Sequence, residues 1–592
     1  MFLSDLPFRS ALHRGKTSEE ALLLQLFWDF FGIFGWMLPM TTSTGHRSEI
    51  FALSDEYIDK GARMSPMACT ALGIPGYDHL LDDFSVAQAD KEAALSEEFL
   101  KRAKALTPID EIDRIAKEVL IERIEARLKL HASKESFISY SPIVNPASNI
   151  RSIFTLMNTE GDEAISNITA RLNCVGEALD SWKSTIEEMH ALGLGTARRQ
   201  VSVVAEQLKV HGSGNYSSFA QQLDPDGKYP ALHAAAKNAE AASLRMSDWM
   251  RDVHAPRSTD VDAVGEARYA PWARYFTGAE LDLRATYEWG VQDLQNINDR
   301  MYAAAEKLGL KGKTLAEVAD YCENAELHRI EGEENLVKKL LSFTEDAVKL
   351  LNGKYFDIDP KIAFCDARIA PAGSAAAPYY MAPSEDLSRP GTTWYPTLGH
   401  TTFNFWHIAS TWYHEAVPGH HLQFGTAALE KDRLSRFQRT DAWISGYGEG
   451  WALYAERFMD ELGAFDEPSL ELGYLAGQAL RAARVVVDIG MHLGYKDFDG
   501  NVWNAESAHK LLVERALMAP DFAQSEIERY LGWPGQAISY KVGERVWMQI
   551  REDAKRRLGD KFDIKKFHNY ALAIGPMGLD PLAREMQAWD GN

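Results

Sequence analysis

Histidines in the stretch "TWYHEAVPGHHLQF", residues 411–424, could bind a metal ion. The His-Glu pair that begins at His414 matches the start of the zinc-peptidase signature H-E-x-x-H, in which two histidines four residues apart share one helix face and bind one ion. Here the residue four positions after His414 is Pro418, and the next histidines are His420 and His421. The spacing therefore predicts a metal site only if the helix is deformed after its first histidine.

The Pro418-Gly419 pair can supply that deformation. Proline lacks the backbone N–H and crowds the carbonyl four residues back, and glycine allows backbone angles that other residues avoid. We expect a helix over residues 403–423 with the pair looped out, which would bring His420 to the position of the second ligand. His421 is the competing ligand, although an undistorted helix would place it about 10 Å farther along the axis. If His420 binds the metal, His421 becomes a candidate for substrate contact or a packed polar neighbour.

A third ligand is expected from "SGYGEGWALYAERF", residues 445–458. Catalytic zinc sites use three protein ligands, and two histidines with one glutamate form a known set. In a helix over this stretch Glu449 and Glu456 share one face. We predict Glu449 as the third ligand. Glu456 would then accept a hydrogen bond from a ligating histidine, or it would be a solvated or ion-paired helix carboxylate.

Glu415 is the candidate catalytic carboxylate. It projects about 100° around the helix from His414, so it is not expected to be a ligand. It could instead reach a water molecule that is activated by a single zinc ion. A carboxylate in that position can take a proton from water and return it to a leaving amine. This is the chemistry of peptide hydrolysis.

Four further residues are candidates for supporting roles. Tyr540 in "PGQAISYKVG" could donate to a developing oxyanion, or be a core tyrosine. Asp488 and His492 are spaced to meet on one helix face, either beside the site or as a buried pair that braces helices. Arg389 in "DLSRPGTTWY" could bind a substrate carboxylate with two parallel hydrogen bonds, or brace a turn.

The elements that must position these residues are mainly helical. Apolar residues recur at three- and four-residue spacing with charges between them, as in "ENLVKKLLSFTEDAVKLL". Between about residues 355 and 399 the runs "KIAFCDARIA", "APYYMAP" and "GTTWYPTL" are β-prone and broken by Pro and Gly. They predict a small sheet next to the metal helix, with one strand lining the substrate groove.

The sequence is interpreted as three parts. Residues 1–49 form an apolar leader, either disordered or a docked helix; residues 50–350 form an N-terminal helical lobe; residues 351–592 form a C-terminal half with the sheet and the metal-binding helices. We expect a mainly α fold with two lobes around a cleft.

Composition narrows the possible partners. The chain has 592 residues and a formal net charge of -22, which repels phosphate backbones and argues against nucleic acid. Its four cysteines have no C-x-x-C spacing, which favours a reducing, cytoplasmic location. Residues 21–40 are apolar, but Asp29 interrupts them, so a membrane span is not expected. This leader still leaves export or membrane attachment open.

Several blocks resemble a large bacterial family catalogued as domain of unknown function 885, placed among zincin-type metallopeptidases. The resemblance covers about residues 50 to 590 and includes "YHEAVPGHHLQ", "GYGEGWALYAE", "DLSRPGT", "RVVVDIGMH" and "PGQAISYKVG". It implies a helical zincin-like (gluzincin-type) fold with His414, His420 and Glu449 as ligands of one zinc ion and Glu415 as the catalytic carboxylate.

The sequence thus predicts a zinc metallopeptidase-like hydrolase that acts on short or modified peptides. One alternative is an amidase that acts on a non-peptide amide. Another, from a different class, is a catalytically silent helical binding protein with a structural metal. Glu415 distinguishes the enzymes from the binding protein, because a structural site does not require it.

Overall fold

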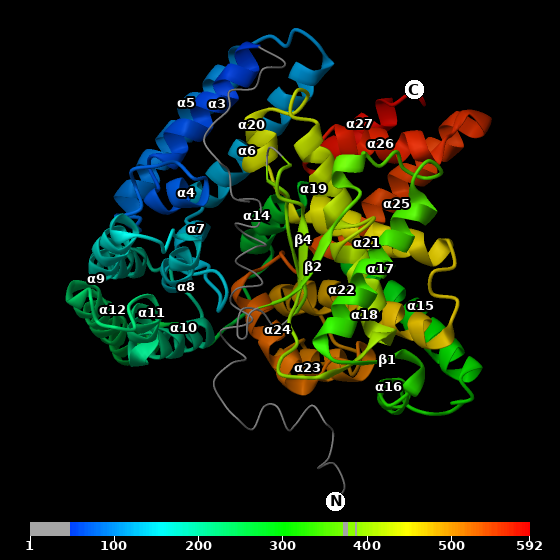
Figure 1. Ribbon diagram of the computed structural model, residues 1–592. Helices are drawn as coiled ribbons and strands as arrows, with labels where there is room; N and C mark the ends of the chain where they lie inside the picture. The colour runs from blue at the N-terminus through cyan, green and yellow to red at the C-terminus, as the bar shows by residue number, and fades with distance from the viewer. Residues whose placement is uncertain (1–47, 371–376, 385–386) are drawn as a thin grey trace, which may run out of the picture.

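The computed structural model describes residues 48–370, 377–384 and 387–592, and these are mainly helical, as the sequence predicts (Figure 1). The longer helices of the first half are α3 (Glu49–Ala62), α4 (Pro66–Ala71), α5 (Val86–Ala105), α6 (Glu111–Ala132), α8 (Pro146–Ile153), α9 (Asp162–Ala191), α10 (Arg198–Val210), α11 (Tyr216–Leu223), α12 (Pro230–Trp249), α14 (Glu266–Thr277), α15 (Leu283–Lys307), α16 (Leu315–Glu323) and α17 (Glu333–Leu351). Short helices α7 (Glu135–Ile138) and α13 (Ala255–Arg257) connect them.

The helices that follow are α18 (Phe405–Glu415), α19 (His420–Leu429), α20 (Arg436–Thr440), α21 (Ser445–Glu461), α22 (Pro468–Leu493), α23 (Ala505–Arg515), α24 (Pro520–Gly532), α25 (Ser539–Leu558), α26 (Ile564–Ala573) and α27 (Leu579–Ala588). The predicted leader over residues 1–49 lies outside the described residues, except for its last two. Among the helices that the structure describes, none has the length and apolar character needed to cross a membrane.

The predicted small sheet is present. Strands β2 (Asp366–Ile369), β3 (Tyr379–Met381) and β4 (Thr392–Tyr395) form it in the order β2-β4-β3, with β2 parallel and β3 antiparallel to β4. Each strand falls within one of the three β-prone runs. A separate antiparallel pair is formed by β1 (Arg329–Glu331) and β5 (Thr402–Asn404), and β5 leads directly into α18.

Two large hydrophobic cores account for most of the buried apolar residues that the structure describes. The larger contains buried residues from α3 to α27, so it joins helices from both sides of residue 350. The smaller belongs to residues 67–255 and is built mainly by α9, α10 and α12, at the lower left of Figure 1. Helix α10 also contacts α24, where Gln200 donates to the carbonyl of Glu528 (2.8 Å). The division at residue 350 and the two lobes around a cleft stay predictions.

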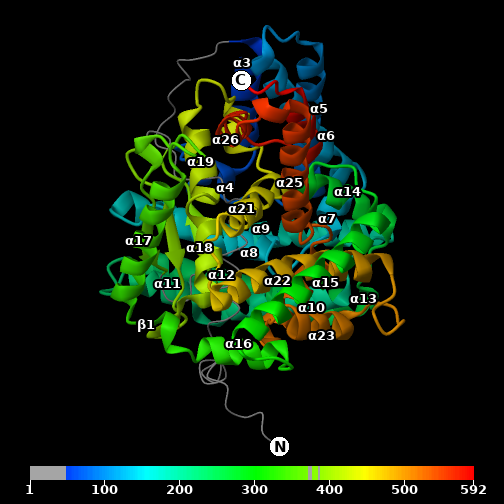
Figure 2. The ribbon, with the colours of Figure 1, turned by 90° about the vertical axis from the view of Figure 1, so that its right-hand side faces the viewer.

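The helices nearest the metal motif are packed within the larger core. Figure 2 shows α15 and α22 side by side, and α18 packs against both α21 and α22. Helices α21 and α25 cross where Gly450 meets Gly543: a Cβ on Gly450 would lie 2.5 Å from Cα of Gly543. Gly450 thus allows α21 to approach α25 closely, and Gly448 makes room for the ring of Trp443; Glu449, between these two glycines, is buried.

Candidate metal centre

The predicted deformation is a complete break between two helices. Helix α18 ends at Glu415, the Val417–Pro418 peptide is cis, and α19 begins at His420. The expectation of one helix over residues 403–423 with a two-residue bulge is therefore wrong. Pro418 has no N–H to continue the α18 hydrogen-bond ladder, and the chain folds back so that the N–H of Gly419 donates to the carbonyl of Tyr413 (3.0 Å).

Gly419 is required by a close approach. A Cβ at this position would lie 1.8 Å from the carbonyl oxygen of His414, far inside van der Waals contact. Trp451 of α21 holds the same turn, because its indole N–H donates to the carbonyl of Pro418 (3.0 Å). The turn is thus set by its own glycine and by the helix that carries Glu449.

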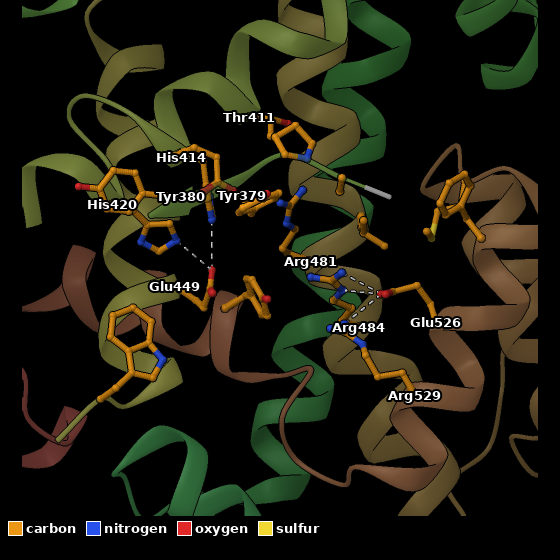
Figure 3. Close-up of a pocket in the computed structure, with 18 of the residues that line it drawn as sticks. Tyr379, Tyr380, Thr411, His414, His420, Glu449, Arg481, Arg484, Glu526 and Arg529 are labelled. Atoms are coloured by element: carbon orange, nitrogen blue, oxygen red, sulfur yellow. Dashed lines mark hydrogen bonds and ion pairs between the residues drawn. The ribbon is translucent and has the colours of Figure 1, made fainter. Parts of the chain in front are cut away.

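His414, His420 and Glu449 converge in the interior (Figure 3). Their potential ligand atoms all lie within 4.8 Å of one another. Nε2 of His414 is 3.1 Å and Nε2 of His420 is 3.6 Å from Oε2 of Glu449. Two histidines and a glutamate are a donor set that suits zinc. The residues that the sequence analysis favoured as ligands therefore come together.

Glu456 lies behind His414. Nδ1 of His414 donates to Oε1 of Glu456 (2.8 Å), and the hydroxyl of Ser410 donates to the other carboxylate oxygen. Because Nδ1 is bound, Nε2 is the nitrogen that faces Glu449. Both partners are almost fully buried, so Glu456 is in the position predicted for an orienting carboxylate.

Charge is strongly coupled in this cluster. Burial disfavours the charged form of His414, but hydrogen bonds to Glu449 and Glu456 outweigh it and raise the pKa of His414 to about 10. Burial would also raise the pKa of Glu449, yet His414 and His420 hold that pKa well below its usual range. The cluster therefore holds an ionised carboxylate next to a protonated imidazole. A metal cation bound there would take the place of the imidazole proton that faces Glu449.

Glu415 lines the same cavity, of about 280 Å³, as the three clustered residues. Burial raises the pKa of the Glu415 carboxyl, opposed by the positive charge of His414. A carboxyl with a raised pKa is suited to taking and returning a proton near neutral pH. Tyr540 and the β3 residues Tyr379 and Tyr380 also line the cavity, so a strand borders the site as the sequence predicts.

His421 faces a different way. Its Nε2 donates to the carbonyl of Ile362 (2.9 Å), and its Nδ1 meets the hydroxyl of Tyr380 (3.0 Å). Burial lowers the pKa of His421 to about 4, so it is neutral. This histidine ties α19 to the segment before the sheet and to β3. It is a packed polar neighbour of the cluster.

The remaining predicted residues lie away from the cavity lining. Asp488 accepts hydrogen bonds from the hydroxyl of Tyr269 (2.6 Å) and the N–H of Gly535 (3.0 Å), and His492 donates to the carbonyl of Tyr530 (3.0 Å). These contacts brace helices.

Arg389 donates to the carbonyl of Ala382 (2.8 Å) and lines a separate small cavity with Trp394. This is the turn-bracing position that the sequence analysis considered for it.

The structure also brings to the cavity a group of charged residues that the sequence analysis did not single out: Arg481, Arg484, Glu526 and Arg529. A signal for two of them was present, since "LRAARVVVDIG" places two arginines three residues apart in an otherwise apolar helix. In Figure 3 they lie across the cavity from the histidines.

Comparison with known proteins agrees with this mainly helical fold. The family model described as "Bacterial protein of unknown function (DUF885)" matches residues 66–586, and the chain belongs to this family. A search of curated proteins found no significant match.

Two solved structures share the fold. One is described as a "putative lipoprotein from Colwellia psychrerythraea"; it is 20% identical, covers 91% of this chain and 98% of its own, and has a TM-score of 0.77. The other, a "putative lipoprotein of unknown function from Shewanella oneidensis", is 18% identical, covers 91% of this chain and 100% of its own, and has a TM-score of 0.73. At these identities the likeness is one of fold.

Proposed function

We propose that the protein is a zinc-dependent hydrolase that cleaves short or modified peptides. One observation carries this proposal: a single cavity is lined by a buried set of two histidines and one glutamate and by a further carboxylate, Glu415. A structural metal site needs its ligands only. The additional carboxylate favours a hydrolase over a silent binding protein.

His414, His420 and Glu449 would hold the ion. The chemistry of this donor set fits zinc, because Nε2 of both histidines is directed at the carboxylate of Glu449. Zinc supplies Lewis acidity, which activates water and polarises a carbonyl. Glu456 would keep the Nε2 lone pair of His414 directed at the ion by accepting the proton of Nδ1.

The chain's own groups would then move the protons. Glu415 takes a proton from the attacking water and delivers it to the leaving amine, a role that a buried carboxyl with a raised pKa can fill. Tyr540 lines the cavity and would donate its hydroxyl proton to the developing oxyanion as a hydrogen bond.

The size of the cavity limits the substrate. A volume of about 280 Å³ is at the lower end of ligand sites, which are roughly 300–1,000 Å³. Its lining is rich in aromatic residues, and Phe424 and Trp443 lie against His420 of the metal cluster. A short peptide or a modified amino acid fits such a space, and a folded protein does not.

The test is a comparison of the parent chain with Glu415→Gln. We expect the purified parent to contain one zinc per chain and to hydrolyse members of a mixed library of short peptides and simple amides. Glu415→Gln should keep its zinc and lose at least about a hundredfold in turnover, the usual range for a general base. Glu177→Gln on the exposed face of α9 is the matched control.

Unchanged turnover in Glu415→Gln would refute the assigned role. A zinc-loaded parent that cleaves no peptide or amide would refute the hydrolase. Preference for non-peptide amides over every peptide would instead identify the amidase alternative.

A further inference from the structure

Three arginines and one glutamate form the end of the cavity that faces the metal cluster. Arg481 and Arg484 project from α22, and Glu526 and Arg529 belong to α24 (Figure 3). Arg484 and Arg529 both donate to the same oxygen, Oε2 of Glu526, at 2.8 and 3.1 Å. The carboxylate of Glu526 therefore accepts hydrogen bonds from two buried guanidinium groups.

Arg484 is held in a fixed position. Besides the contact with Glu526, its Nε lies 3.1 Å from the hydroxyl of Tyr530, to which it donates, and its guanidinium lies over the ring of Tyr540, 4.7 Å from the centroid. A guanidinium that is fixed from two sides needs little further ordering when an anion binds. This end of the cavity is preorganised.

Arg481 forms no ion pair with any carboxylate of the described residues, although its charge acts on Glu415 across the cavity. It is half-buried, and the hydrogen bond that its guanidinium makes is a long one, from Nη1 to the carbonyl of Gly477 (3.3 Å). Its Nε is buried and has no hydrogen-bond acceptor among the described residues. A buried donor that lacks a partner is costly. The guanidinium of Arg481 therefore has N–H donors left to bind an anion in the cavity that this residue lines.

The charge at this end is consequently positive. Three guanidinium groups face one carboxylate, although the chain as a whole carries a net charge of -22. A local excess of positive charge inside an acidic protein is not a consequence of its composition. Guanidinium groups bind carboxylates through two parallel hydrogen bonds, and a carboxylate is the anion that a peptide hydrolase meets on every substrate with a free carboxyl end.

We propose that Arg481, supported by Arg484 and Arg529, binds the free terminal carboxylate of the substrate, so that the protein cleaves near the carboxyl end of short peptides or acylated amino acids. This inference rests on the proposed function. Met518 and Phe522 line the cavity too, and Phe522 is one helical turn from Glu526 on α24. They would receive an apolar side chain next to that carboxylate.

The first test measures binding without turnover. Calorimetric titration of the full chain, as purified and after removal of metal with a chelator, would use N-acetyl-L-leucine and its amide as probes. We expect the acid to bind at least tenfold more tightly than the amide in both preparations. Arg481→Gln should remove this preference, Arg481→Lys should keep part of it, and Arg545→Gln, exposed on α25, should leave it intact.

The second test uses hydrolysis of matched peptides. A peptide with a free carboxyl end should be cleaved at least tenfold faster, as kcat/KM, than the same peptide ending in an amide, and Arg481→Gln should abolish the difference. Replacement of a side-chain Glu by Gln in the peptide should have little effect. A loss that follows the side-chain change instead would overturn the assignment to the terminal carboxylate.

The two proposals fail in different ways. If the parent hydrolyses peptides but does not distinguish acid from amide in either assay, the role of Arg481 is refuted and the hydrolase stands. If no substrate is cleaved but the chelated protein still prefers the acid through Arg481, the carboxylate site stands and the hydrolase is refuted. Unchanged thermal unfolding midpoints for the Arg481 variants would establish that lost binding is not lost folding.

Discussion

Nδ1 of His414 and Oε1 of Glu456 are 2.8 Å apart in a region almost without solvent contact, and this hydrogen bond joins α18 to α21. It fixes the imidazole so that its other nitrogen faces Glu449. Glu456 lies seven residues after the candidate ligand Glu449 on α21, so this helix supplies both one ligand and the carboxylate that orients another ligand, His414.

Glu456→Gln should weaken zinc binding by roughly tenfold or more, because loss of an orienting carboxylate typically lowers metal affinity by 10- to 100-fold. The amide keeps the shape of the side chain but not its charge. Competition with a chromophoric chelator measures the affinity. Glu461→Gln, an exposed carboxylate near the end of the same helix that pairs with the buried Arg551, is the control. Equal affinities in the two variants would contradict the orienting role.

His420→Ala should abolish stoichiometric zinc binding, whereas His421→Ala should retain it. The first removes a nitrogen from the cluster. The second leaves the carbonyl of Ile362 and the hydroxyl of Tyr380 without their partner, which should reduce stability by about 1–3 kcal/mol per unsatisfied group. Metal analysis of both proteins and thermal unfolding of the chelated forms provide the comparison. Retention of zinc by the first and its loss from the second would reverse the assignment.

Gly419→Ala should strongly destabilise the site. The added methyl group would overlap the carbonyl of His414, so the turn between α18 and α19 must shift and the two histidines must separate. We expect a lower unfolding midpoint together with loss of zinc. Gly61→Ala in α3 adds the same methyl group where nothing lies within 4 Å, and should be neutral or stabilising by up to about 1 kcal/mol. Normal zinc content in the Gly419 variant would show that the turn tolerates a side chain.

Because of Asp488, the free energy of unfolding should fall as pH rises from about 4 to 7. Burial raises its pKa to about 7, although hydrogen bonds from Tyr269 and Gly535 oppose the shift. The folded chain therefore holds a proton on Asp488 that the unfolded chain releases near pH 4, so this contribution is full below that pH and is lost as pH approaches 7. By linkage the effect is at most roughly 4 kcal/mol.

Asp488→Asn should flatten that part of the pH profile and raise the stability at pH 8 relative to the parent. Urea denaturation between pH 5 and 8, with a chelator present so that zinc does not contribute, gives the profile. Asp180→Asn, exposed on α9, should follow the parent. A profile in Asp488→Asn as steep as that of the parent would contradict the assignment.

Patterns among neighbouring residues in the sequence were sufficient to predict much of the secondary structure. The helical periodicity and the β-prone runs correspond to helices and strands of the structure, because each depends on neighbouring residues. The convergence of His414, His420 and Glu449 was also predictable, because a proline and a glycine between two histidines interrupt the helix and change the direction of the chain.

What the sequence could not provide was contact between distant segments. The break at Pro418 proved larger than a bulge because Gly419 is drawn against the end of α18 and Trp451 holds the turn from another helix. Arg484 and Glu526 are on different helices, so their distance along the sequence gives no sign that they form an ion pair. Only packing reveals that these charges meet inside a cavity.

The three proposed ligands come from α18, α19 and α21, which meet only in the folded chain. The unfolded chain has no site that brings these three ligands together. On the proposed assignment, the free energy of zinc binding therefore adds to the free energy of unfolding. Free zinc at a hundred times its dissociation constant would add about 2.7 kcal/mol to the stability. The lifetime of this protein in the cell would then depend on the supply of a trace metal, and scarcity of zinc would remove the protein as well as its activity.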